Sequence, residues 1–175
     1  MLAERMDIGY GETAIDRTVK KMVQLAREGG HDPMVILSAQ NIVRHCPSRL
    51  EQARAIYRWV KEHTVYVKDP AGLEMLQTPK FMLIQIANGN APAAGDCDCL
   101  STLAAALLVA AGFPAGFRVI NRPMDFLMGD PYNFAHVYNI VWFGGVPLPF
   151  DLSERSFRFG QEHFYVLRKD IPINA

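Results

Sequence analysis

The chain carries no excess of charge of either sign. Its 175 residues include 18 Lys and Arg against 18 Asp and Glu, which gives a formal net charge of +0 at pH 7. Proteins that bind nucleic acid or anionic membrane surfaces usually present clusters of Lys and Arg, and this sequence has no such run. The balance of charge therefore argues against nucleic-acid and membrane partners.

Cysteine and long apolar runs are also scarce. Cys46, Cys97 and Cys99 are too few and too clustered for a disulfide framework, which favours a reducing compartment. The most apolar run, residues 100–111, is shorter than the roughly 20 residues that cross a bilayer. The first seven residues carry charges where a signal peptide needs its apolar core. We therefore expect a cytoplasmic protein.

Length and composition are those of an ordinary globular chain. Half of the residues are hydrophobic and 21% are charged, so we expect one domain over residues 1–175. Apolar residues recur with helical spacing early in the chain, over residues 13–28, 33–45 and from 48 onward. Strand-like patterns follow later, over residues 117–121, 134–143, 146–151 and 163–167.

This order of elements predicts an α+β fold. We expect an N-terminal helical part (1–47) and a core (48–175) that holds the candidate chemistry. The helix over residues 100–111 is apolar on every side, so it should be the buried central helix of that core. The later strands should form an antiparallel β-meander on which this helix packs.

A thiol stands at the expected start of that central helix. Asp96 is a suitable N-cap, which makes Cys97 the first helical residue. The partial positive charge at a helix N-terminus favours thiolate over thiol. Cys99 lies about 200° further around the helix, so only one of the two cysteines can face a base on a neighbouring element.

A predicted hairpin supplies an imidazole and a carboxylate in a checkable geometry. If Gly144 and Gly145 form a two-residue turn, His136 lies opposite Ser153 and diagonally across from Asp151. Diagonal neighbours on one face of a sheet are within reach of each other's side chains. A thiol, an imidazole and a carboxylate are the three groups that nucleophilic cysteine chemistry requires.

These motifs resemble the transglutaminase-like superfamily, within the papain-like cysteine-proteinase fold. The resemblance covers roughly residues 50–153. In such families the nucleophilic cysteine follows Gly-Asp, about fifteen residues before a Gly-Ile-Pro-Ala-like turn, and Cys97 and Gly112 have this spacing. The resemblance implies that Cys97 is the nucleophile, His136 the base and Asp151 the residue that orients it. Acids often found two residues after the cysteine and four after the histidine are replaced by Cys99 and Ile140.

The resemblance implies acyl transfer on an amide bond, with hydrolysis of a protein or peptide preferred and no metal or cofactor. The oxyanion would be bound by the backbone N–H of Cys97 and a side-chain donor, for which Gln77, with Gln85 behind it, is the candidate. One alternative is a non-catalytic fold used for binding or phage assembly, and a second is a protein cross-linking transglutaminase. The layout also resembles small phage- and prophage-encoded proteins, which adds a virion-associated location to the expectations.

Two other uses of these residues compete with that hypothesis. Asp96, Cys97, Asp98 and Cys99 could hold a metal ion, although zinc sites usually have a second paired half that this sequence lacks. His163 is a rival base, but it lies in an expected strand without a clear carboxylate partner.

The remaining candidates are expected to be structural. This group comprises Cys46 and three histidines near expected helix ends, His31, His45 and His63. Four aromatic residues near the end of the chain are expected in the core rather than in a binding groove: Phe157, Phe159, Phe164 and Tyr165.

Overall fold

The computed structural model describes residues 3–6, 12–70, 74–89, 92–128 and 134–173. Its helices are α1 (Glu12–Gly30), α2 (Pro33–Val43), α3 (Arg49–His63), α4 (Pro79–Ala87), α5 (Cys97–Ala110) and α6 (Pro123–Met128). Its strands are β1 (Ala3–Met6), β2 (Thr64–Tyr66), β3 (Glu74–Gln77), β4 (Ala93–Gly95), β5 (Ala115–Asn121), β6 (His136–Phe143), β7 (Val146–Phe150) and β8 (Leu167–Pro172). The mixture of helices with an antiparallel sheet confirms the predicted α+β class.

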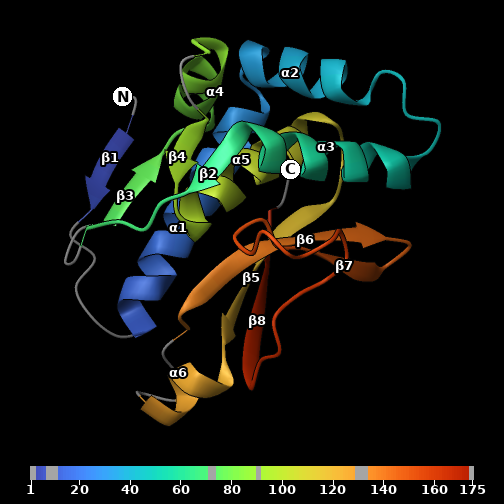
Figure 1. The fold of residues 1–175 in the computed structure, drawn as a ribbon. Coiled ribbons are helices and arrows are strands. Elements are labelled where there is room, and N and C mark those ends of the chain that lie inside the picture. Colours follow the sequence, from blue (N-terminus) through green and yellow to red (C-terminus); the bar gives the residue numbers. More distant parts are fainter. Residues whose placement is uncertain (1–2, 7–11, 71–73, 90–91, 129–133, 174–175) are drawn as a thin grey trace.

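Helix α5 is the centre of the fold. Its residues 98–108 are all buried, as its apolar composition on every side predicted. Helices α1 to α4 pack against α5, and β5 and β6 pack against it as well. Figure 1 shows these helices gathered on one side of the sheet that β5 to β8 form. No helix within the described part of the chain is long and apolar enough to cross a membrane.

The main sheet is antiparallel, in the order β7-β6-β5-β8. Gly144 and Gly145 have φ values of 56° and 84°, which a type I′ hairpin turn requires and which glycine adopts without strain. The turn sets Phe143 opposite Val146 and Asn139 opposite Phe150, which is the predicted register. The prediction of a β6–β7 hairpin is therefore confirmed.

The last strand differs from its prediction. We expected residues 163–167, whereas β8 begins at Leu167, opposite Asn121, and runs to Pro172 along the other edge of β5. Val166 still donates its N–H to the carbonyl oxygen of Asn121, the last residue of β5, at 2.9 Å. Residues 163–165 lie beyond that end of β5, although their composition is typical of a strand. Phe164 is 82% exposed there, so its expected place in the core is wrong.

The sequence predicts a short strand over residues 64–67, and β2 confirms it, whereas several other short elements were absent from the sequence prediction. Helix α4 begins after Thr78, whose hydroxyl accepts the N–H of Phe81, and Pro79 occupies its first turn. This Thr-Pro pair is a helix-start signal. Strands β2 and β4 form a small parallel pair, and β1 and β3 form an antiparallel pair. Pairs this short depend on tertiary packing rather than on a repeating pattern.

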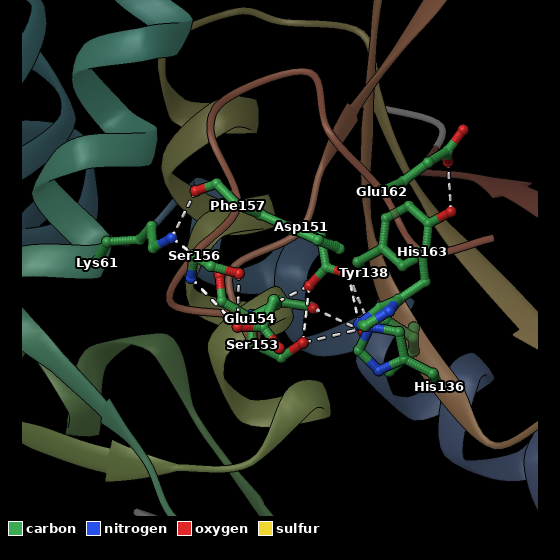
Figure 2. A network of polar contacts seen from close by, with 12 residues as sticks. Lys61, His136, Tyr138, Asp151, Ser153, Glu154, Ser156, Phe157, Glu162 and His163 are labelled. Carbon is green, nitrogen blue, oxygen red and sulfur yellow. Dashed lines mark hydrogen bonds and ion pairs between the residues drawn. The ribbon is translucent and has the colours of Figure 1, made fainter. Parts of the chain in front are cut away.

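The segment after β7 is held against α3. The Tyr57 hydroxyl lies 3.0 Å from the carbonyl oxygen of Asp151 and 2.9 Å from that of Phe157. The Lys61 ammonium donates to three carbonyl groups of this segment at 2.8–3.0 Å, and Figure 2 shows its side chain directed into the loop. In return, Arg155 donates to the carbonyl oxygen of Lys61 at 3.1 Å. These bonds fix the chain that follows Asp151.

Replacement of Lys61 should therefore loosen this segment. We expect Lys61→Met to lower the free energy of unfolding by about 1–3 kcal/mol, since carbonyl groups lose a charged donor. Urea denaturation followed by circular dichroism measures the change. Lys80→Met is the matched control, because Lys80 forms an exposed ion pair with Asp32 and should cost under about 1 kcal/mol. Equal losses in the two variants would contradict the anchoring role.

Candidate functional site

Cys97 occupies the first position of α5. Asp96 is the N-cap residue in an extended conformation, and its side chain makes no capping hydrogen bond. The N–H groups of the first helical turn have no acceptor within the helix, so they lend positive potential to this end. Cys97 is partly exposed. The sequence placed it correctly at the tip of the helix.

Cys99 faces the opposite way. It is fully buried, its thiol lies 3.1 Å from the carbonyl oxygen of Met75, and it accepts the N–H of Gln77 at 3.3 Å. Burial, followed by the charges of Asp98 and Asp96, raises the pKa of the Cys99 thiol well above its usual value. The prediction that Cys99 turns into the core is confirmed by its burial.

Cys97 and His136 line the same cavity. This cavity has a volume of about 280 Å³ and lies between the start of α5, the start of β6 and helix α1. Helix α1 contributes Thr18, Val19 and Met22 to its wall. A larger set of lining residues comes from the strands and loops around it: Tyr66, Lys68, Val119, Phe134, Ala135 and Val137. A thiol and an imidazole therefore face the same cavity, and the rest of its wall is partly apolar.

His136 and Asp151 form a direct pair. Nε2 of His136 lies 2.9 Å from Oδ2 of Asp151, and both side chains are buried, with 6% and 0% exposed. Figure 2 shows the His136 ring directed at the carboxylate. The hairpin register brings the pair together, as the sequence predicted. The bond to Nε2 leaves Nδ1 as the ring nitrogen for a second partner.

Ser153, which the predicted register sets opposite His136, supports this pair through contacts that the sequence did not predict. Its N–H and its hydroxyl donate to Oδ1 of Asp151 at 3.1 and 2.8 Å, and the hydroxyl lies 3.3 Å from Nε2 of His136. Burial raises the pKa of Asp151, but the hydrogen bonds from His136 and Ser153 outweigh burial and lower the pKa below its usual value. An Asp followed two residues later by Ser is a sequence signal for such a turn.

His163 lies on the same carboxylate. Its Nε2 is 3.9 Å from Oδ2 of Asp151, and its ring centroid is 5.2 Å from that of His136, nearly at a right angle. The expectation that His163 has no carboxylate partner is therefore wrong. Burial lowers the pKa of His163, and Asp151 only partly offsets the effect. The contact spans an irregular loop between Asp151 and His163, which has no helical or strand period, so no sequence pattern predicted it.

A network of charges holds the His163 segment to the sheet. Arg118 on β5 is buried and pairs with Asp170 at 2.7 Å and with Glu162 at 2.9 Å. Tyr138 on β6 donates its hydroxyl to Glu162, which Figure 2 shows beside His163. The hydrogen bonds to Asp170 raise the pKa of Arg118, so the guanidinium stays positively charged. This network fixes the residue next to His163.

Gln77 is not among the residues that line the cavity. Its side-chain amide donates to the carbonyl oxygen of Ala94 at 2.7 Å and accepts from Gln85 at 2.7 Å. The two glutamines named as oxyanion candidates thus bond to each other and to β4. The geometry gives the oxyanion role of Gln77 no support.

The acidic and thiol groups at the start of α5 also come close together. Ligand atoms of Asp96, Asp98 and Cys99 lie within 4.8 Å of one another. However, the Cys99 sulfur already lies 3.1 Å from the carbonyl oxygen of Met75 and accepts the N–H of Gln77 at 3.3 Å, so the buried thiol is engaged by β3. The donor set therefore does not favour the metal interpretation of this motif.

His31, His63 and Cys46 have local partners. Nδ1 of His31 lies 2.8 Å from the carbonyl oxygen of Arg27, and Nδ1 of His63 lies 2.8 Å from that of Trp59. Both contacts are at helix ends, as expected for these histidines. His45 is exposed. The Cys46 thiol is 3.9 Å from the carbonyl oxygen of Ile42.

Two solved structures share the fold at low sequence identity. A putative cysteine protease from Cytophaga hutchinsonii superposes with a TM-score of 0.51 and 15% identity over 86% of this chain and 49% of its own. A putative protease from Parabacteroides distasonis gives 0.56 and 14% over 89% of this chain and 29% of its own. The chain thus spans about half or less of these proteins' lengths.

A comparison with curated proteins gives no match. The family model of the transglutaminase-like superfamily matches residues 38–152, a stretch that includes Cys97, His136 and Asp151. This match covers well over half of the sequence, and the solved structures agree with it in fold. The chain belongs to the transglutaminase-like superfamily.

Proposed function

We propose that this protein is a cysteine-dependent acyl-transfer enzyme that hydrolyses an amide bond in a protein or peptide. The observation that carries the proposal is that Cys97 and His136 line one cavity while Nε2 of His136 bonds to Asp151. The preference for hydrolysis is supported by the names of the two solved structures, both called proteases.

The charge at Cys97 depends on opposing effects. The start of α5 favours a thiolate, because the N–H groups of the first turn point toward it. Asp96 and Asp98 flank Cys97 in the chain, and each opposes a second negative charge when ionised. A protonated His136 in the same cavity offsets them. The thiolate is therefore expected to exist as an ion pair with the imidazolium.

The three side chains then have distinct roles. Asp151 accepts the proton on Nε2, orients the ring and stabilises its positive charge. The Cys97 thiolate attacks the carbonyl carbon, and His136 protonates the leaving amine as the C–N bond breaks. Water, with His136 as the base, then hydrolyses the thioester and restores the thiol. Ser153 keeps Asp151 in place.

The oxyanion needs donors on the cavity side of Cys97. The backbone N–H of Cys97 is one candidate, as predicted. Tyr66 is a better second candidate than Gln77, because Tyr66 lines the cavity and pairs with Gly95 across β2 and β4. Burial and the nearby Cys97 raise the pKa of Tyr66 to about 12, so the hydroxyl keeps its proton and can donate.

The pH dependence of thiol alkylation tests the ion pair. We expect iodoacetamide to label wild-type Cys97 with a midpoint at or below about pH 7.5. His136→Ala should move the midpoint to about 8.5 or higher, since the flanking carboxylates then lack a compensating charge. Mass spectrometry of the Cys97 peptide measures the rate, with Cys46 as an internal reference. His45→Ala is the control variant, and a wild-type midpoint near 8.5 would refute the activated thiol.

Loss of the Asp151 charge should slow acylation. With p-nitrophenyl acetate, we expect Asp151→Asn to release p-nitrophenol about 10²–10⁴-fold more slowly, because the amide favours the wrong tautomer of His136. Glu154→Gln, three residues further along, should change the rate less than about twofold. If Asp151→Asn reacts at the wild-type rate, Asp151 does not orient the base.

The same assay separates the three hypotheses for function. For a hydrolase, the acyl group leaves Cys97 as free acid even when a small primary amine is added. Dominant amide product would instead identify an acyl transferase of the cross-linking type. No acylation of Cys97 at any pH would favour a binding or assembly role for the fold.

Tyr66→Phe and Gln77→Ala should separate the two oxyanion candidates. We expect Tyr66→Phe to lower the acylation rate about 10- to 100-fold with an unchanged labelling midpoint, because an oxyanion donor acts on the transition state alone. Gln77→Ala should mainly lower the melting temperature, because its amide bonds to β4. Acylation that is slower only in Gln77→Ala would return the role to Gln77.

A further inference from the structure

Two imidazoles meet at one carboxylate oxygen beside the cavity. Nε2 of His136 and Nε2 of His163 lie 2.9 and 3.9 Å from the same atom, Oδ2 of Asp151. Figure 2 shows both rings converging on this carboxylate. The proposed mechanism uses the first contact only. His163 therefore needs an explanation of its own.

We infer that His136, Asp151 and His163 form a binding site for a divalent transition-metal ion such as Zn²⁺. Two imidazole nitrogens and one carboxylate oxygen form a donor set that zinc accepts. The ligand atoms of the three residues all lie within 4.8 Å of one another. Zinc–ligand bonds of about 2.0–2.2 Å place neighbouring tetrahedral ligands about 3.3 Å apart. The contacts of 2.9 and 3.9 Å bracket that spacing, so small side-chain movements suffice.

The surroundings already hold these ligands in place. Ser153 donates two hydrogen bonds to Oδ1 of Asp151, which leaves Oδ2 for an ion. The His163 ring packs against Phe157, with centroids 4.8 Å apart. Outer partners of this kind orient metal ligands and raise affinity. The Ser153 hydroxyl, 3.3 Å from Nε2 of His136, is close enough to serve as a fourth ligand, as is a water molecule.

An ion can reach the site from the side of His163. The Asp151 side chain is fully buried and that of His136 is 6% exposed, whereas the His163 side chain is 25% exposed. His163 therefore forms the solvent-facing edge of the site. His163 is also not among the residues that line the cavity, so an ion can approach this ligand directly from solvent.

Metal binding would remove the reactivity of the Cys97 thiol as a nucleophile. This consequence rests on the proposed function. An ion on Nε2 displaces the proton that bonds to Asp151 and holds His136 in the tautomer protonated on Nδ1. Such a ring cannot take a further proton, so Cys97 loses its base. The metal is thus expected to act as a reversible inhibitor that binds at the base and its orienting residue.

Metal binding is best measured without the thiol. In a Cys97→Ala background, isothermal titration with Zn²⁺ should show one site, and Co²⁺ should give the visible absorption of a tetrahedral complex. Adding His163→Gln should weaken Zn²⁺ binding at least about tenfold, since a ligand is lost. His31→Gln is the matched control and should leave binding unchanged, because His31 lies at the end of α1. Histidine NMR signals of His136 and His163 should shift together in the Cys97→Ala protein.

The outcomes of these binding and NMR experiments support or overturn the proposed metal site. Equal Zn²⁺ affinity with and without His163→Gln, no Zn²⁺ binding, or shifts confined to other histidines would overturn the site. The NMR result also protects the test against a His163→Gln variant that folds poorly. In the wild-type chain, Zn²⁺ should slow alkylation of Cys97 and a chelator should restore it. Binding without slower alkylation would overturn the inhibitory consequence, whereas a thiol that is unreactive without metal would refute the proposed function and leave the binding data standing.

Discussion

The burial of α5 on all sides is the constraint on which the rest of the structure depends. A helix without a polar face must be covered completely, so helices α1 to α4 and strands β5 and β6 are all held against it. The same elements carry or support the site: α5 presents Cys97, β6 presents His136, and α3 anchors the segment after Asp151. Packing of the core and assembly of the site are therefore one process.

One contact of the site is set by local structure, and the other depends on how separate elements pack together. The pairing of His136 with Asp151 follows from a two-residue turn and a strand period of two, both of which are visible in the sequence. The approach of Cys97 to His136 instead requires α5 to pack on β6. In the sequence, this second relation was available only through the resemblance to a family.

The limits of prediction follow the same division. The long helices have a strong apolar period, α5 is apolar on every side and the hairpin has a Gly-Gly turn, and all of these were predicted. The start of β8 was misplaced because residues 163–165 have a strand-like composition but lie beyond the end of β5. The contact of His163 with Asp151 spans an irregular loop, and that of Arg118 with Asp170 joins segments distant in the chain, so no spacing rule predicts either. Gln77 was an oxyanion candidate from its place in a motif, yet its side-chain amide donates to the carbonyl oxygen of Ala94 on β4.

The wall that α1 gives to the cavity has a consequence for how such proteins diverge. Thr18, Val19 and Met22 lie before residues 38–152, the stretch that defines the superfamily in this chain. Part of the surface that a bound molecule would contact is thus encoded outside the stretch that carries the reactive groups. Substitutions in α1 can reshape what the cavity admits while the thiol, imidazole and carboxylate stay as they are, so selectivity and chemistry are free to evolve separately.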